Sequence, residues 1–219
     1  MEKPCGKSLY NSFLNFDFIN LLSLTLNRFL FYMNTEINKA LEVLLAGGLL
    51  LYPTDTIWGI GCDATNGEAI RRIYALKQRD DAKSLIVLLA EAKDIFQYVA
   101  NPHPDIVSMI KDFDRPTTVI YEQAIGLPDN LVNGDGSIAI RITKDPFCKS
   151  LIKRLKKPLV STSANISGEP SPLSFAHIDP RVKGGVDYVV DHRREDESNA
   201  PASRILRILA DGSITIIRP

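Results

Sequence analysis

The chain has 219 residues, of which 45% are hydrophobic and 24% charged, and this composition excludes a disordered or fibrous protein. Its 26 Lys and Arg residues balance its 26 Asp and Glu residues, so net charge cannot attract a nucleic acid and only a local basic patch could hold one. The length suits one domain, or a single large α/β unit, with enough core to support a pocket.

The cysteines and histidines give no sign of a disulfide framework or a metal centre. Cys5, Cys62 and Cys148 are an odd number without a close pair, which favours a protein of the reducing cytoplasm. The histidines are far apart and lack the spacing of metal ligands. We therefore expect no metal site built by the protein, and surface or helix-cap positions for His103, His177 and His192.

The first 32 residues differ from the rest of the chain. Residues 13–31 are rich in apolar side chains, but polar and charged residues interrupt them, which argues against a membrane-spanning segment. A signal peptide is not indicated either, because no cleavage site of small residues follows. We expect residues 1–32 to be an N-terminal extension without a part in the chemistry, and residues 33–219 to form the functional domain.

An independent helix is predicted directly after Met33. Asn34 or Thr35 can cap its start, and Glu36 suits its first turn. Gly47-Gly48 gives a natural end to the segment. Between these limits the apolar residues recur at helical spacing, at Ile37, Leu41, Leu44 and Leu45.

From residue 49 onward, short apolar runs alternate with amphipathic segments. The apolar runs predict strands at residues 49–53, 84–89, 117–121, 137–143, 158–160 and 186–190, and a hairpin of residues 203–219 that turns at Asp211-Gly212. The amphipathic segments predict helices over residues 66–77, 91–98 and 103–112, and another that begins at Asp145-Pro146. Strands with interspersed helices indicate an α/β or α+β fold with a mixed sheet.

Basic residues gather on one predicted strand and on the segment that follows it. Strict alternation in SIAIRIT, residues 137–143, places its isoleucines on one face and Arg141 on the other. From Arg141 to Lys157 there are seven basic residues and one acid. This run is typical of a surface that binds nucleic acid and, about equally, of a solvated helix face.

Short hydroxyl and amide side chains cluster where predicted strands end. The densest cluster is STSANIS, residues 161–167, and smaller ones occur in YPTDTIWG, RPTT and SRI. Such residues either satisfy turns by bonding their own backbone or bind an anion. P-loop, dinucleotide-binding and nucleophile-elbow patterns are missing from the sequence. The inventory of hydroxyls and cations suits a phosphorylated ligand held by charge and hydrogen bonds.

Four stretches, in their order and spacing, resemble the YrdC-like family of threonylcarbamoyl-AMP synthases, the short TsaC type. They are LYPTDTIWGIGCDA, IYALKQRDDAKSLIVLL, IAIRIT and PLVSTSANISGEPSP, and the resemblance covers about residues 34–219. It implies a single-domain YrdC-like fold, a twisted mixed α/β sheet flanked by helices with a concave, positively lined cavity. It also implies an enzyme that makes threonylcarbamoyl-AMP and pyrophosphate from L-threonine, bicarbonate or CO2, and ATP that carries Mg²⁺.

The resemblance assigns roles to single residues. It implies that charge on the reacting phosphates is neutralised by Lys77, Arg79 and Arg141. It places ATP against Arg79, Lys83, Ser163, Ser171 and Arg218. It places L-threonine against Thr56, Thr118, Ser161 and Ser203, while Asn165 braces the loop. No tightly bound cofactor and no membrane is implied, and tRNA and its modification proteins would be indirect partners in the cytoplasm.

Some positions depart from the family pattern. Asp114-Arg115-Pro116 stands where members usually show Pro-Gly-Pro, and Leu88 stands where they often show His. These changes bear on the threonine contacts. Two alternatives to a synthase stay open: an RNA-binding or translation-factor-like module, which the basic run supports, and a family member that kept the fold and lost the reaction.

Overall fold

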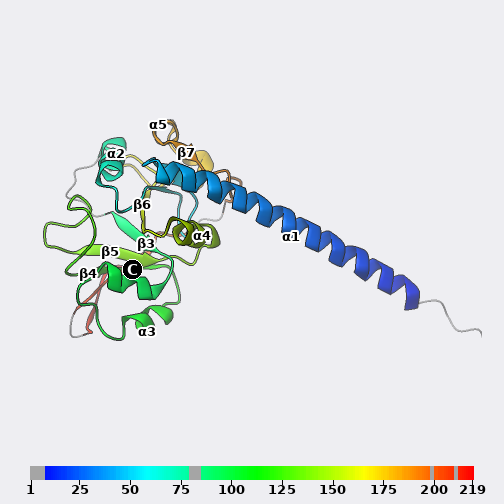
Figure 1. The fold of residues 1–219 in the computed structure, drawn as a ribbon, viewed down its shortest axis with the longest axis horizontal. Coiled ribbons are helices and arrows are strands. Elements are labelled where there is room, and N and C mark those ends of the chain that lie inside the picture. Colours follow the sequence, from blue (N-terminus) through cyan, green and yellow to red (C-terminus); the bar gives the residue numbers. More distant parts are fainter. Residues whose placement is uncertain (1–7, 79–84, 198–199, 210–211) are drawn as a thin grey trace, which may run out of the picture.

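One mixed sheet forms the centre of the computed structural model, which describes residues 8–78, 85–197, 200–209 and 212–219 (Figure 1). Its strands lie in the order β7-β1-β2-β6-β3-β5-β4-β8-β9. Their bounds are β1 Leu50–Tyr52, β2 Gly59–Gly61, β3 Ile86–Leu89, β4 Thr117–Tyr121, β5 Ile138–Ile142, β6 Leu159–Ser163, β7 Tyr188–Val189, β8 Arg204–Ile208 and β9 Ile214–Arg218. The predicted α/β class with a mixed sheet is confirmed.

Parallel and antiparallel pairs are interleaved across the sheet. β1 and β7, β3 and β5, and β4 and β8 run parallel, whereas the remaining neighbours are antiparallel. Ile86 of β3 lies opposite Ala139 of β5 on one side and Ser161 of β6 on the other. This order brings strands that are far apart in the sequence to the middle of the sheet. The predicted hairpin of β8 and β9 forms, although Asp211 of its turn lies outside the described residues.

Helices cover both faces of the sheet (Figure 1). The helices α1 (Ser8–Leu45) and α4 (Pro146–Leu155) pack together on one face through a cluster that includes Leu50 and Leu88. A second cluster on the other face joins the sheet to α2 (Gly67–Lys77), the 3-10 helix η1 (Ala92–Gln97), α3 (Ile106–Lys111) and α5 (Pro180–Gly185). A short 3-10 turn, η2 (Phe175–His177), packs beside that cluster.

Two helix starts follow directly from the sequence. The Asn66 side chain accepts hydrogen bonds from the backbone N–H groups of Glu68 and Ala69 at the start of α2, at 3.0 and 3.1 Å. The Asp145 side chain accepts one from Cys148 N at 2.8 Å at the start of α4. These bonds satisfy N–H groups that a helix leaves without a partner. Both predicted starts are confirmed.

Gly61 allows the short strand β2 to pack closely against β6. A Cβ atom at this position would lie 2.2 Å from the carbonyl oxygen of Val160, so only glycine allows β2 to approach β6 this closely. The Tyr52 hydroxyl donates to the same Val160 oxygen at 3.1 Å. The glycine therefore serves strand packing.

The predicted independent helix after Met33 is instead the last part of one helix, α1, that begins at Ser8. Neither expected cap acts as one. The Asn34 side chain accepts from Arg154, and the Thr35 hydroxyl donates to the carbonyl oxygen of Phe31, one turn earlier, at 3.0 Å. Both side chains therefore make the contacts of residues inside a helix, and neither caps a helix start.

Glu36 ties α1 to the far edge of the sheet. Its carboxylate is buried and accepts from the Tyr188 hydroxyl at 2.6 Å, from Asp191 N at 2.8 Å and from Lys39 Nζ at 2.9 Å. Burial alone raises the pKa of Glu36, but these three hydrogen bonds outweigh burial and leave the pKa below its ordinary value. The ionised carboxylate therefore fixes the end of α1 against β7.

The predicted surface or helix-cap position of His192 is wrong. This side chain is buried between the rings of Phe29 and Phe147, at centroid distances of 5.9 and 5.6 Å. Burial, followed by the charge of Arg193, lowers the pKa of His192. The histidine therefore acts as an aromatic spacer between α1 and α4.

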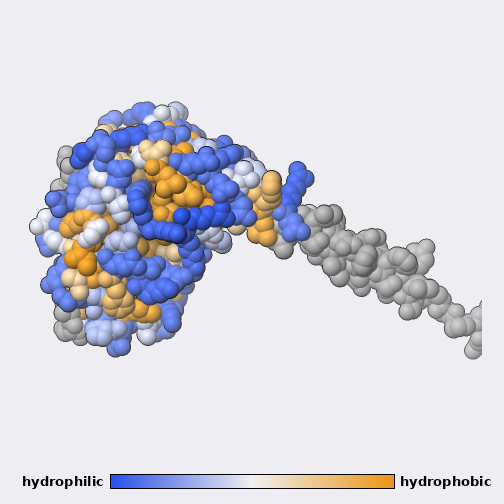
Figure 2. Space-filling model, in the orientation of Figure 1, coloured by the Kyte–Doolittle hydropathy of each residue, from blue (hydrophilic) through white to orange (hydrophobic). Residues whose placement is uncertain are grey.

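Part of the predicted extension contacts the body of the protein. Besides Phe29, the Tyr32 hydroxyl donates to Asp191, and this bond raises the pKa of Tyr32 to about 12. Figure 2 shows apolar residues where α1 leaves the body, and Phe31 there is 75% exposed. Among the described helices, none is long and apolar enough to cross a membrane.

Two truncated chains test the predicted boundary at residue 33. A chain that begins at Met33 loses both contacts of Phe29 and Tyr32, so we expect its free energy of unfolding to fall by about 1–2 kcal/mol with the fold retained. A chain that begins at Arg28 keeps both residues and should melt like the full chain. Thermal unfolding followed by circular dichroism measures both, and a collapse of the Met33 chain would show that the extension is integral.

Candidate functional site

A cavity of 310 Å³ opens on the sheet face that carries α1 and α4, beside the area that these helices cover. Its apolar floor is made by Ile86, Ile120 and Ala139, one from each of three neighbouring strands. Among the residues predicted for the site, the cavity wall includes Thr56, Arg141, Ser161, Ser163, Ser171, Ser203 and Arg218. Residues separated by more than 160 positions therefore meet in one place.

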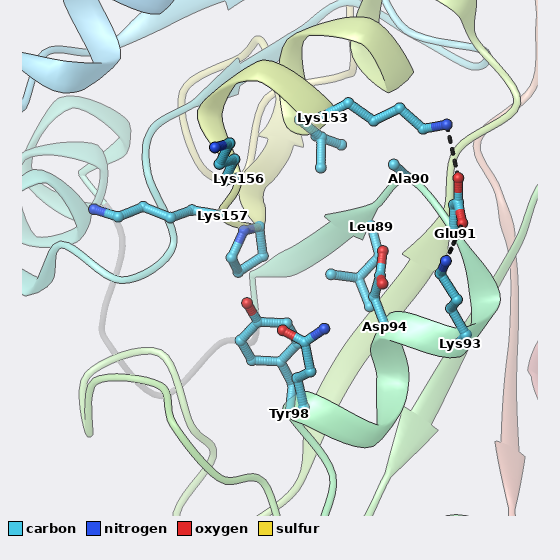
Figure 3. A pocket seen from close by; sticks show the side chains of 12 residues that line it. Leu89, Ala90, Glu91, Lys93, Asp94, Tyr98, Lys153, Lys156 and Lys157 are labelled. Carbon is cyan, nitrogen blue, oxygen red and sulfur yellow. Dashed lines mark ion pairs between the residues drawn. The ribbon is translucent and has the colours of Figure 1, made fainter.

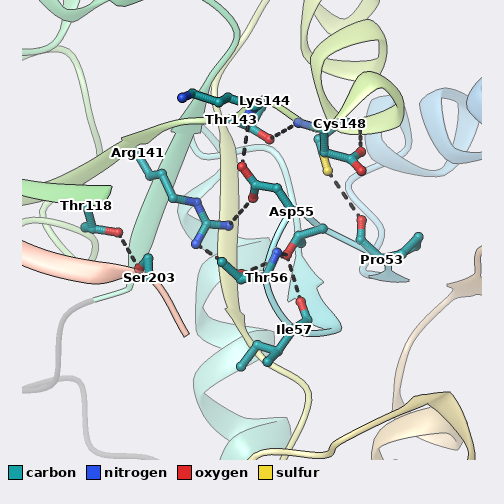
Figure 4. A network of polar contacts seen from close by, with 12 residues as sticks. Pro53, Asp55, Thr56, Ile57, Thr118, Arg141, Thr143, Lys144, Cys148 and Ser203 are labelled. Atoms are coloured by element: carbon teal, nitrogen blue, oxygen red, sulfur yellow. Dashed lines mark hydrogen bonds and ion pairs between the residues drawn. The ribbon is translucent and has the colours of Figure 1, made fainter. Parts of the chain in front are cut away.

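Arg141 lies at the centre of this wall. Alternation along β5 turns Ile138 and Ile140 into the core of the opposite face and Arg141 into the cavity, as the sequence predicted. Its guanidinium is 3.2 Å from Asp55 Oδ1 and donates to Thr56 Oγ1 at 3.3 Å (Figure 4). Its Nε atom is buried and has no hydrogen-bond partner within the described part of the chain. A buried donor of this kind favours an anionic ligand.

Asp55 is a site residue that the sequence analysis did not single out. It follows β1 in the turn PTDT, which Thr54 holds by donating to the carbonyl oxygen of Ile57 at 2.8 Å and accepting from Thr56 N at 3.0 Å. The second Asp55 oxygen accepts from Lys144 N at 3.0 Å (Figure 4). A lone acid among the hydroxyls of YPTDTIWG was the available signal, because a buried arginine needs a counter-charge.

Arg193 is a second residue that sequence reasoning missed. Its guanidinium donates to the carbonyl oxygen of Thr54 at 2.6 Å and pairs with Asp145 at 3.1 Å. It thus fastens the turn that carries Asp55 to the start of α4. Its position in the charged segment HRRED offered no sequence signal for this contact.

The structure of the STSANIS segment is compatible with both of its alternative interpretations. Ser161 and Ser163 of β6 line the cavity, which makes them available to a ligand. The residues after them form a turn in which the Asn165 amide donates to the carbonyl oxygens of Ile166 at 3.0 Å and Glu169 at 2.6 Å. The predicted bracing role of Asn165 is confirmed.

Lys77 supports this loop from the protein interior. The side chain is 1% exposed, and its ammonium donates to the carbonyl oxygens of Ser163 at 2.5 Å and Asn165 at 2.7 Å. Lys77 does not line the cavity described above. Its predicted contact with a phosphate stays a prediction, and the geometry favours a positioning role. Arg79 and Lys83 lie outside the described residues.

The other side of the cavity is built from β4, β8 and β9. The hydroxyls of Thr118 and Ser203 are 2.8 Å apart, and Arg218 donates to the carbonyl oxygen of Ser203 at 2.6 Å (Figure 4 shows the hydroxyl pair). Thr118 is fully buried behind Ser203, outside the cavity lining. Burial, and then the charge of Arg141, lowers the pKa of Arg218. Two guanidinium groups therefore charge the cavity positively.

The basic run from Arg141 to Lys157 does not form one continuous surface. Arg141 enters the cavity, whereas Lys153 pairs with Glu91 at 2.7 Å and Lys157 with Asp63 at 2.6 Å. The Arg154 guanidinium donates to the side chains of Asn34 and Asn38. Lys153, Arg154 and Lys157 thus make their polar contacts within the protein.

The fold and site define a member of the Sua5/YciO/YrdC family. The model of that family, described as "Telomere recombination", matches residues 42–219, and this chain belongs to the family. A threonylcarbamoyl-AMP synthase from Pseudoalteromonas translucida is 34% identical over 160 residues, which cover 72% of this chain and 86% of the relative. One from Stutzerimonas stutzeri is 31% identical over 186 residues, 84% of this chain and 97% of the relative.

A solved structure supports the same fold. The P. abyssi Sua5 protein complexed with L-threonine superimposes with a TM-score of 0.74 at 24% identity, over 84% of this chain. This chain spans 53% of the length of that protein, about half. The predicted YrdC-like fold is therefore confirmed.

Replacing Lys77 with Met separates a loop-holding role from a phosphate contact. Met keeps the length of the side chain but cannot donate to the two carbonyl oxygens, so we expect a loss of about 1.5–3 kcal/mol in the free energy of unfolding without ligand. Arg71→Met, on the exposed face of the same helix, should change stability by less than about 0.5 kcal/mol. Denaturant titration measures both variants. An unchanged stability of Lys77→Met would rule out the loop-holding role.

Proposed function

We propose that this protein is an L-threonylcarbamoyl-AMP synthase, which makes threonylcarbamoyl-AMP and pyrophosphate from L-threonine, bicarbonate or CO2, and ATP. The observation that carries the proposal is the cavity in which Arg141, Arg218 and the cavity hydroxyls meet. Relatives with this activity in their names cover most of this chain, which supports the same reaction. The product would serve the modification of adenosine 37 in tRNA.

The cationic side of the cavity suits the nucleotide. Arg141 and Arg218 supply positive charge, and Ser163 and Ser171 supply hydroxyl donors for phosphate or ribose oxygens. Arg79 and Lys83 join this set on the strength of their motif alone. In the described chain no cluster of His, Cys, Asp or Glu could hold a metal ion, so Mg²⁺ would arrive as part of the ATP substrate.

The hydroxyl side of the cavity suits L-threonine. Thr56 accepts from Arg141, and Ser203 is held by Thr118 and Arg218, so both hydroxyls have fixed orientations. Ser161 lines the same cavity from β6, two residues before Ser163. Thr118 would act from behind Ser203 as a positioning residue. The P. abyssi relative was solved with L-threonine, which supports an amino-acid site in this fold.

The reaction needs alignment and charge neutralisation more than a nucleophilic side chain. The amine of threonine and bicarbonate form a carbamate, with loss of water. A carbamate oxygen then forms a bond to the α-phosphorus of ATP, and the bond to the bridging oxygen breaks to release pyrophosphate. Arg141, fixed by Asp55, would neutralise the negative charge on the phosphate oxygens as this exchange proceeds.

RNA binding is a weaker second candidate. The basic run supported it in the sequence, but several of its members are paired within the protein and one lies in the cavity. A balanced net charge also limits the release of counterions on which such binding depends.

Pyrophosphate release is the direct test of the synthase. The protein should release pyrophosphate from ATP only when both L-threonine and bicarbonate are present, and omission of either should return the rate to background. Release that does not depend on threonine would contradict the proposal. Retention of labelled tRNA by the protein at physiological salt, without any pyrophosphate release, would favour the RNA-binding alternative.

Three serine variants distinguish the two halves of the cavity. Loss of a bond to a charged phosphate should make Ser163→Ala bind ATP about ten- to a hundredfold more weakly, equivalent to about 1.5–3 kcal/mol. Ser161→Ala should raise the threonine requirement more than the ATP requirement. Ser167→Ala, in the same segment but away from the cavity lining, is the control and should change neither. Calorimetric titration measures these affinities. Equal affinities of all three variants for ATP and for threonine would contradict the assignment.

A further inference from the structure

A second cavity, of 450 Å³, lies on the opposite face of the sheet from the proposed active site. Alternation along the central strands separates the two: Ala139 and Arg141 of β5 line the first cavity, whereas Ile140 and Ile142 line the second. Val119 and Tyr121 of β4 continue this floor. The second cavity is therefore mainly apolar at its base and shares no lining residue with the first.

Cations surround the mouth of the second cavity. Lys111, Arg115, Lys144 and Lys149 reach it from α3, from the segments that flank β4 and β5, and from α4. Lys144 Nζ donates to the carbonyl oxygen of Phe113 at 3.0 Å. No ion pair engages Lys111, Arg115 or Lys149 within the part of the chain that the structure describes. Their charge is thus available to a ligand.

The acid in the cavity lining, Glu91, is already neutralised. Its carboxylate lies 2.7 Å from Lys153 Nζ and 3.1 Å from Lys93 Nζ, on the side that faces a neighbouring pocket (Figure 3). The bond from Lys153, and then the bond from Lys93, lower the pKa of Glu91 to about 2. The carboxylate therefore remains ionised and paired, so it does not offset the charges of Lys111, Arg115 and Lys149.

We propose that the second cavity binds a small amphipathic carboxylate, an apolar chain or ring that carries one anionic head group. The floor of Val119, Ile140 and Ile142 would take the apolar body, and Arg115 and Lys149 would take the carboxylate. Charge complementarity and the apolar floor together select this class, because a purely polar anion leaves the floor exposed and a neutral apolar molecule leaves the cations without a partner.

Calorimetric titration with decanoate tests the site on the full chain. We expect saturable binding of one decanoate per protein, and binding of 1-decanol at least about tenfold weaker, because the alcohol lacks the charge. The double variant Arg115→Glu with Lys149→Glu should weaken decanoate binding by at least about tenfold. Lys156→Glu makes the same kind of charge change on a residue that does not line this cavity, and it should leave the affinity unchanged.

A filling variant tests the apolar half of the proposal. Ile142→Trp projects a larger ring into the cavity and should abolish decanoate binding, and a melting temperature near that of the parent chain shows that it folds. If this variant does not fold, the charge variants decide alone. The proposal is wrong if the parent chain shows no saturable binding up to about 1 mM decanoate, or if the double variant binds like the parent. It is also wrong if Lys156→Glu loses as much affinity as the double variant.

Discussion

The buried ion pair between Arg141 and Asp55 is the contact on which the geometry of the site depends. It joins the middle of the sheet to the turn after β1, and the backbone of Lys144 completes the link on the far side of the carboxylate. Side chains that are 4% and 11% exposed attract one another strongly in their low-dielectric surroundings, but removal of either partner leaves an uncompensated charge that costs about 3–5 kcal/mol. The pair therefore fixes a cation in position before any anion arrives.

The polar loop after β6 depends on a different kind of support. Lys77 and Asn165 satisfy carbonyl oxygens of the turn that follows the serines, and these bonds hold the segment that presents Ser161 and Ser163 to the cavity. An ammonium is suited to this task because it has three donors and bonds several oxygens at once. Thus the guanidinium groups of Arg141 and Arg218 lie in the cavity and the ammonium of Lys77 lies beneath the loop, and the two kinds of cation have separate physical roles.

Local rules explain what the sequence could predict. The alternation around Arg141 and the cap at Asp145 depend on neighbouring residues, and both have the predicted structure. The strand expected to end at residue 160 instead continues to Ser163, so the first hydroxyls of STSANIS lie within β6. The cap residues Asn34 and Thr35 predicted a helix start inside what is one long helix, α1. The buried position of His192 depends on a partner far along the chain, Phe147, so local patterns did not reveal it. Arg193 was missed for the same reason, whereas Asp55 had a local signal as the lone acid among the hydroxyls of YPTDTIWG. The predicted roles of Arg79 and Lys83 concern residues that the structure does not describe.

The strand order also affects how the protein folds during its synthesis. Residues of the first cavity come from positions as far apart as Thr56 and Arg218, because β8 and β9 complete the sheet beside β4. During synthesis, the ribosome releases the turn with Asp55 long before Ser203 and Arg218 emerge. Such distant pairing slows folding, since the entropy cost of closing a long loop arises before its stabilising contacts form. A nascent chain with β1 to β6 already formed therefore still lacks one wall of the cavity, which is complete only when the final hairpin docks.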